Sequence, residues 1–325
     1  MLNNFPIFDI KDEDDFTRIA IDIFNFQSEY NPVYKQFLKH LNFTPASVKT
    51  LMDIPFMPIT FFKNHQVVSA PPPFEALFMS SGTTGMQRSR HYVKNLKLYE
   101  ESFVKTFELF YGPVNNYTIL ALLPSYVEQG HSSLVYMVDY LIKASGQNYS
   151  GFYLNDEQFP EILTLADQQQ ANVLLIGVSY ALLDLVSKHQ FQLKSTIVME
   201  TGGMKGRRKE MLREELHQYL TKGFGVDQIH SEYGMTELLS QSYSKGNGIF
   251  RSPPWQKILI RDTEDPLSYL PQGKTGGISV IDLANYHSCA FIATQDLGRH
   301  IDNEHFEILG RFDQSDVRGC NLLIV

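Results

Sequence analysis

The pattern of hydrophobic and polar positions predicts helices near the start of this 325-residue chain. Across 14–41, apolar side chains recur three and four positions apart, the spacing of one helix face, and Asn31-Pro32 divides the pattern into two helices. A second helical pattern covers 94–110. Between these, 54–68 is rich in proline and aromatic residues and predicts an irregular segment packed on the core.

Short apolar runs then alternate with helical patterns. Runs without in–out alternation predict strands buried on both faces at 117–124, 172–179 and 195–203. Helical patterns predict helices at 131–145, about 157–170, 180–189 and 205–221. This alternation predicts an α/β fold with a mostly parallel sheet flanked by helices. From about 225 onward, strand-like segments with tight turns predict a smaller β-rich subdomain.

Composition and charge narrow the class of protein. The chain is 43% hydrophobic and 20% charged, which is typical of a soluble globular protein. Its net charge of −8 (28 basic minus 36 acidic residues) argues against a nucleic-acid surface or a polybasic membrane anchor. The longest apolar region, 173–186, is too short to span a bilayer, so we expect no membrane insertion. The acidic N-terminal segment lacks a signal-peptide pattern, and a cytoplasmic location is expected.

The run Ser80-Ser81-Gly82-Thr83-Thr84-Gly85 is the first chemical signal. Glycines allow a close approach of backbone to ligand, and successive amides with Ser and Thr hydroxyls can hold phosphate oxygens. The spacing is neither GxxxxGK[ST] nor GxGxxG. By itself the run is equally compatible with a linker, so a phosphate site needs support from elsewhere in the chain.

Two glycine-containing segments supply part of that support. Gly202 and Gly203 follow a predicted strand, where a flat base can lie against the backbone. The segment SEYGMTE places Tyr233, Gly234, Thr236 and Glu237 together. In this segment the tyrosine can stack on a purine, the threonine can contact a phosphate, and the glutamate can bind Mg²⁺ through oxygen. Each segment alone is also compatible with an ordinary turn.

Two later segments complete the set. TQDLGR carries Asp296 at a predicted strand end, where an acid can accept hydrogen bonds from ribose hydroxyls. GRFDQSDVRGC carries Arg311 and ends at Cys320. Cys320 and Cys289 are the two cysteines, and neither belongs to a CxxC pair or a Cys/His cluster, which excludes a disulfide scaffold. For Cys289 the pattern favours a buried strand position.

In this order, the five segments resemble the adenylate-forming superfamily of acyl- and aryl-CoA synthetases, luciferases and peptide-synthetase adenylation domains. Residues 80–88 match [ST]SGTTGxPK through Gly85, with Gln87-Arg88 in place of Pro-Lys, and 233–237 match YGxTE. TQDLGR is similar to TGDLG/R with Gln295 for glycine, and 310–319 resembles a shortened GRxDxxIKxxG hinge. The resemblance implies an adenylate-forming domain over 1–309 and a hinge-like tail over 310–325, without a C-terminal lid domain.

IPFMPITFFKNHQVVS and DVRGCNLLIV resemble acyl-protein synthetases of the LuxE type. That resemblance implies ATP- and Mg²⁺-dependent formation of an acyl-adenylate from a long-chain fatty acid, with transfer of the acyl group to a cysteine near the C-terminus. Cys320 is then the expected acceptor. The acylated chain would serve an acyl-protein reductase or an acyl carrier.

The resemblance also implies roles for individual residues. The phosphate-binding set is Ser80, Ser81, Gly82, Thr83, Thr84, Gly85 and Thr236. Adenine would contact Gly202, Gly203, Tyr233 and Gly234; Asp296 and Arg311 would hold the ribose, and Glu237 would bind Mg²⁺. Arg88 and Lys205 would supply the charge of the absent lysine. His131 would either gate the acyl pocket or have a simple capping or packing role.

Two alternatives remain open. The chain could form acyl-CoA or load a carrier protein with a C-terminal domain supplied in trans. It could instead be an inactive scaffold that binds acyl groups or nucleotides.

Overall fold

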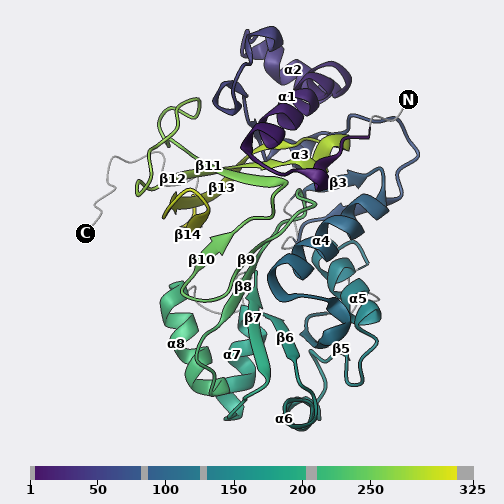
Figure 1. Cartoon of the computed structure of the whole chain (residues 1–325), viewed down its shortest axis with the longest axis vertical. Helices are drawn as coiled ribbons and strands as arrows, with labels where there is room; N and C mark the ends of the chain where they lie inside the picture. The colour runs from purple at the N-terminus through teal and green to yellow at the C-terminus, as the bar shows by residue number, and fades with distance from the viewer. Residues whose placement is uncertain (1–3, 82–86, 125–129, 203–210, 313–325) are drawn as a thin grey trace.

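The computed structural model describes residues 4–81, 87–124, 130–202 and 211–312 (Figure 1). Its α-helices are α1 (Glu13–Tyr30), α2 (Pro32–His40), α3 (Phe61–Asn64), α4 (Leu96–Tyr111), α5 (Ser133–Ser145), α6 (Phe159–Gln169), α7 (Ser179–Lys188) and α8 (Arg213–Phe224). Its 3-10 helices are η1 (Ile7–Asp9), η2 (Pro45–Ser47), η3 (Leu51–Asp53), η4 (Val114–Asn116) and η5 (Leu283–His287).

The first strands are β1 (Met57–Pro58), β2 (Ala76–Met79), β3 (Arg90–Val93), β4 (Thr118–Leu122), β5 (Gly151–Phe152), β6 (Val173–Val178) and β7 (Thr196–Thr201). The later ones are β8 (His230–Tyr233), β9 (Ser242–Ser244), β10 (Ile249–Arg251), β11 (Gln256–Arg261), β12 (Gly276–Asp282), β13 (Phe291–His300) and β14 (His305–Arg311). This order confirms the predicted α/β class.

One mixed sheet organises the described residues. Its strand order is β11-β12-β13-β14-β10-β9-β8-β7-β6-β4-β5, and β1 pairs with β13. Strands β4 to β8 pair parallel with one another, and β1 pairs parallel with β13. Strand β8 pairs antiparallel with β9, and β9 to β14 pair antiparallel with one another. Helices α4 and α5 lie on one side of the parallel strands, and α7 and α8 on the other (Figure 1). The carboxyl ends of β7 and β8 therefore meet at one edge of the sheet.

The segments after residue 225 form strands, with η5 between β12 and β13. They are hydrogen-bonded to the parallel part through the β8–β9 pair, so the sheet is continuous. Three predicted boundaries shift. Helix α8 begins at Arg213, whereas the pattern predicted a start near 205, and α5 begins at Ser133 after the Ser132 cap. The predicted irregular segment 54–68 contains the short elements β1 and α3.

Aromatic side chains join the N-terminal helices to the sheet. Phe24 of α1 and Tyr34 of α2 both contact Phe291 of β13, with ring centroids 6.0 and 6.3 Å apart, and all three are buried. The predicted break between α1 and α2 occurs at Asn31, whose side chain accepts hydrogen bonds from the amides of Val33 and Tyr34. Packing of one apolar face, not helix propensity alone, stabilises such short helices.

Cys289 lies in this core and is fully buried, as predicted. It precedes β13 instead of belonging to a strand, because η5 ends at His287 and the chain must turn before pairing begins at Phe291. Burial raises the pKa of the Cys289 thiol to about 12, so this sulfur stays protonated at neutral pH.

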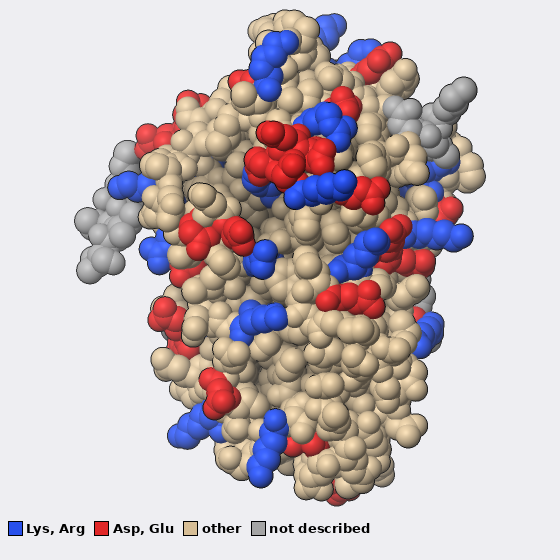
Figure 2. Space-filling model, viewed as in Figure 1, with Lys and Arg blue, Asp and Glu red and all other residues tan. Residues whose placement is uncertain are grey.

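Among the described residues, no helix combines the length and apolar character that crossing a membrane would require. On the face shown in Figure 2, acidic and basic side chains are interspersed, and the acidic ones gather over its upper part. No continuous basic area covers that face.

Candidate active site

The β2–β3 hairpin frames the Ser/Thr/Gly loop. Its strands pair antiparallel from Ala76–Val93 to Met79–Arg90. Beyond them, the Ser80 amide donates to the Ser89 carbonyl at 3.1 Å, and the Ser80 hydroxyl accepts from the Ser89 amide at 2.9 Å. Ser80 therefore closes the base of the loop, and Ser81 is exposed at its start. The expected contributions of Gly82, Thr83, Thr84 and Gly85 lie outside the described residues.

Glu237 lies at this loop base. Its side chain is 6% exposed and lies near the Ser89 side chain, whose hydroxyl acts to lower the pKa of the carboxyl. Burial raises the pKa of Glu237, while the Ser89 hydrogen bond and the Arg311 charge oppose that rise. A single buried carboxylate beside a loop rich in amides and hydroxyls suits Mg²⁺, which prefers one or two carboxylates together with phosphate oxygens. The residues present thus fit a Mg²⁺–nucleotide complex.

A polar trio joins β8, β13 and β14. The Tyr233 hydroxyl donates to Asp296 Oδ2 at 2.7 Å, and Arg311 Nε lies 3.1 Å from Asp296 Oδ1. Asp296 and Arg311 are register partners on β13 and β14, so pairing of the strands brings them together. The structure thus gathers three of the residues that the sequence assigned to nucleotide binding. Burial, and then the Asp296 charge, raise the pKa of Tyr233, so its hydroxyl stays protonated as a donor.

Gly202 and Gly234 lie at the ends of β7 and β8. Gly202 has φ +67°, a left-handed conformation that glycine adopts without strain, and its carbonyl accepts from Ser179 Oγ at 2.7 Å. A Cβ on Gly234 would come within 2.4 Å of Glu232 Oε1. Glycine at 234 therefore allows the chain to turn past a buried carboxylate. Gly203 lies outside the described residues.

Arg88 and His131 lie at the periphery. Both residues are exposed. The His131 carbonyl accepts from the Met79 amide at 2.8 Å, and its Nδ1 lies 3.2 Å from the Leu77 carbonyl, so His131 contacts the edge of β2. Ser132 caps the N-terminus of α5, because its side chain accepts a hydrogen bond from the Val135 amide. The capping role considered for His131 is therefore wrong.

Two buried glutamates at this edge were not foreseen from the sequence. Glu200 on β7 lies 3.6 Å from Arg213 Nε and 3.7 Å from His217 Nε2. Burial raises the pKa of Glu200, but the His217 hydrogen bond and the Arg213 charge outweigh it, and the net shift is downward. Glu232 on β8 accepts from the Thr201 hydroxyl. The strand sequences TIVMET and HSEY contain no pattern that predicts burial of the glutamate side chain.

Glu232 makes stability depend on pH. Burial, and next the neighbouring Glu200 charge, raise the pKa of Glu232 from 4.5 to about 7, although the Thr201 hydrogen bond opposes them. Between those values the folded protein binds more protons than the unfolded chain, so stability falls as pH rises through this window. The stabilising contribution of protonated Glu232 is fully present when the pH is below 4.5, its pKa in the unfolded chain. It is lost when the pH rises above about 7, its pKa in the folded protein.

We expect Glu232→Gln to remove this pH dependence. The measured quantity is the unfolding free energy of the variant minus that of wild type. This difference should be more positive at about pH 8 than at about pH 5, by roughly 2 kcal/mol. Urea unfolding at both pH values measures the difference, with the exposed Glu264→Gln as control. An equal effect of Glu232→Gln at both pH values would contradict the assignment.

Comparisons with known proteins identify the family and the fold. A family model described as "Acyl-protein synthetase, LuxE" matches residues 131–325. No curated protein matches the chain. The solved structure of ATP-bound MatB from Rhodopseudomonas palustris is similar, with a TM-score of 0.55 and 18% identity over 73% of this chain and 48% of that one. The chain thus spans about half the length of the MatB structure.

A second similar structure is 2-hydroxyisobutyryl-CoA ligase in the postadenylation state in complex with 2-HIB-AMP. It has a TM-score of 0.67 and 13% identity, over 93% of this chain and 68% of that one. At these identities the likeness concerns the fold, which is that of adenylate-forming ligases. The family match covers more than half of the sequence and includes Glu237, Asp296 and Arg311. The chain belongs to the LuxE acyl-protein synthetase family.

Proposed function

We propose that this chain uses ATP to activate a long-chain fatty acid as an acyl-adenylate and then transfers the acyl group to its own Cys320. The observation that carries the proposal is the position of Glu237, a buried carboxylate beside Ser89, which pairs with Ser80 at the base of the Ser/Thr/Gly loop. Family membership adds the expectation of a protein acceptor.

In the first step, a carboxylate oxygen of the fatty acid attacks the α-phosphorus of ATP, and pyrophosphate leaves. The described site would bind the nucleotide through the base of the loop and through Asp296 and Arg311. Asp296 keeps acceptor capacity for ribose hydroxyls, because one of its oxygens accepts a single hydrogen bond from the Tyr233 hydroxyl and the other contacts Arg311. Mg²⁺ held at Glu237 supplies charge neutralisation on the phosphates.

In the second step, the Cys320 thiolate attacks the acyl carbonyl, a thioester forms, and AMP leaves with the bonding electrons. Phe312, at the end of the described chain, donates its amide to the Gln295 carbonyl at 2.7 Å, next to Asp296. Cys320 follows eight positions later in the sequence. Eight residues span at most about 28 Å when extended, a chain length that would allow the thiol to reach an adenylate bound at Asp296.

Mass spectrometry of the intact protein after incubation with ATP, Mg²⁺ and fatty acids of mixed length tests this function. We expect an ATP-dependent mass increase equal to one fatty acid less one water molecule, and hydroxylamine should remove it. Measurement of fatty-acid-dependent ATP–pyrophosphate exchange in parallel separates adenylation from transfer. Exchange without an adduct, together with acyl-CoA or acyl-carrier formation, would favour a ligase that uses a domain in trans. Absence of exchange across fatty and aryl acids would favour a scaffold.

Delivery of the acyl group is part of the same proposal. A protein thioester is an activated carbonyl and suits transfer to an acyl-protein reductase or an acyl carrier. Mixing the acylated protein with candidate acceptors and following loss of the adduct would identify the partner class.

A further inference from the structure

Two buried side chains hold the backbone on either side of the Glu237 side chain. His91 Nδ1 lies 2.8 Å from the Thr236 carbonyl oxygen, and Asn285 Nδ2 donates to the Glu237 carbonyl at 2.7 Å. Their exposed fractions are 1% and 0%. The two consecutive carbonyls are therefore held from β3 on one side and from η5 on the other.

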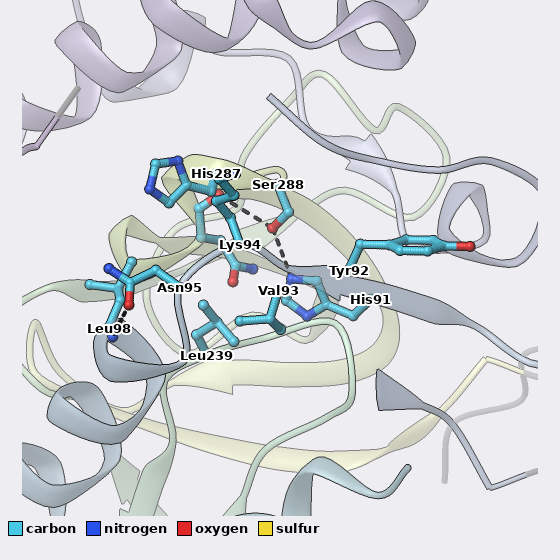
Figure 3. Close-up of a pocket in the computed structure, with 10 residues that line it drawn as sticks. His91, Tyr92, Val93, Lys94, Asn95, Leu98, Leu239, His287 and Ser288 are labelled. Carbon is cyan, nitrogen blue, oxygen red and sulfur yellow. Dashed lines mark hydrogen bonds between the residues drawn. The ribbon is translucent and has the colours of Figure 1, made fainter. Parts of the chain in front are cut away.

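The hydrogen bonds determine the protonation of His91. A carbonyl can only accept, so Nδ1 carries the hydrogen, and Nε2 accepts from the Ser288 hydroxyl at 2.9 Å (Figure 3). Burial lowers the pKa of His91 to about 4, although the Thr236 carbonyl opposes that shift. The neutral Nδ1–H tautomer is thus the stable form at neutral pH.

Strand β3 connects this clamp to the loop. Ser89 directly precedes β3 and His91 lies within it, two positions apart, so their side chains share one face of the extended chain. The Ser89 side chain lies near the Glu237 carboxylate, and His91 donates to the Thr236 carbonyl. The Ser89 backbone also pairs with Ser80 at the loop base. One short segment therefore contacts both the loop and the carboxylate.

The N-terminal helices anchor the other end of the clamp. The Ser288 carbonyl accepts from Asn31 Nδ2 at 2.7 Å, from Ser69 Oγ at 2.8 Å and from Gln27 Nε2 at 3.2 Å. Gln27 Nε2 also donates to the Asn285 carbonyl at 3.0 Å. All these side chains are buried, so the bonds are protected from water. A continuous set of hydrogen bonds runs from α1 to the Glu237 segment.

His91 also lines the small cavity in Figure 3, together with Lys94, Leu239 and His287. Its volume of about 10 Å³ has room for at most about one water molecule. It can hold neither a nucleotide nor an acyl chain.

We propose that His91 and Asn285 are positioning residues that fix Glu237 relative to the Ser80–Ser89 pair for binding of Mg²⁺-ATP. This inference rests on the proposed function, because it assigns Glu237 to that complex. Metal and phosphate positioning tolerates little displacement, and a carboxylate on a short turn depends on its supporting hydrogen bonds.

Kinetics of ATP–pyrophosphate exchange test the role. His91→Leu removes both hydrogen bonds and should raise the half-saturating concentration of Mg²⁺-ATP at least about tenfold, with a smaller change for the fatty acid. His91→Asn keeps an N–H donor near the Nδ1 position and should recover most of the loss. His287→Asn is the matched control, because this buried histidine lines the same cavity but is not among the described hydrogen-bond partners of residues 236 and 237. Equal effects of His91→Leu on both substrates would indicate a general folding role and overturn the inference.

A second measurement does not depend on activity. Long-range proton–nitrogen NMR spectra of wild-type protein should show His91 as the Nδ1–H tautomer at neutral pH, and its signals should move on addition of Mg²⁺-ATP. An Nε2–H tautomer, or signals unmoved by a nucleotide that raises the Tm, would contradict the inference. Wild type with neither exchange nor nucleotide-induced change in Tm would refute the proposed function itself. Normal exchange in wild type with unchanged Mg²⁺-ATP saturation in His91→Leu would refute only the positioning role.

Discussion

Replacing Cys320 by alanine is expected to abolish the hydroxylamine-labile acyl adduct while ATP–pyrophosphate exchange continues within about twofold of wild type. The two steps use different groups: the nucleotide site forms the adenylate, and the thiolate accepts the acyl group. Removal of the sulfur should therefore leave the first step intact and eliminate the second. Intact-protein mass spectrometry and exchange measurements on the same sample report the two steps separately.

Cys289→Ala is the control for this experiment. Cys289 is fully buried and burial raises the pKa of its thiol to about 12, so it is a poor nucleophile. The variant should still form the adduct, apart from any loss of stability that thermal unfolding would reveal. Persistence of a labile adduct in Cys320→Ala would show that another residue accepts the acyl group. If the adduct disappears in Cys289→Ala while the fold stays intact, the buried cysteine is the acyl acceptor.

Replacing Glu237 by glutamine should reduce the rate of ATP–pyrophosphate exchange by about 10² to 10³-fold, since loss of a metal-binding charge removes several kcal/mol of transition-state stabilisation. Glutamine keeps the size of the side chain and can still accept a hydrogen bond from Ser89. The change therefore tests charge more than packing. Exchange rates as a function of Mg²⁺ concentration measure the effect.

Glu237→Asp provides the matched comparison, because it keeps the charge and shortens the side chain by one methylene. We expect it to recover part of the activity at high Mg²⁺. The same carboxylate affects the pH profile. Burial raises the pKa of Glu237, so the carboxylate loses its charge at a higher pH than an exposed glutamate would. Exchange by Glu237→Gln at the wild-type rate would remove this residue from the proposed mechanism.

Local patterns predicted the elements of this fold well. Periodic apolar positions indicated α1, α2, α4 and the buried strands β4, β6 and β7, because burial of one face or of both faces leaves a direct mark on the sequence. The errors occurred at boundaries. Helix α5 begins at Ser133, where Ser132 caps it, two residues beyond the expected start. Cys289 precedes its strand because η5 must end before β13 begins.

The sequence also indicated part of the site. Tyr233, Asp296 and Arg311 were predicted to serve one nucleotide, and the structure brings their side chains into contact. Each lies in a short motif, and strand pairing of β13 with β14 places two of them opposite each other. The loop at Ser80 and the carboxylate of Glu237 were likewise expected at one site, and Ser89 connects them.

The sequence by itself determined the fold class, the family resemblance and the residues that carry the proposed chemistry, because these depend on periodicity and on short motifs. Only the tertiary structure decided what holds Glu237 in place. His91 and Asn285 contact residues 236 and 237 across sequence separations of 145 and 48 residues. Histidine and asparagine are common in strands and turns, and no local pattern shows which of them will meet a buried carbonyl. That pairing arises when the sheet and the N-terminal helices pack together and every buried polar group needs a partner.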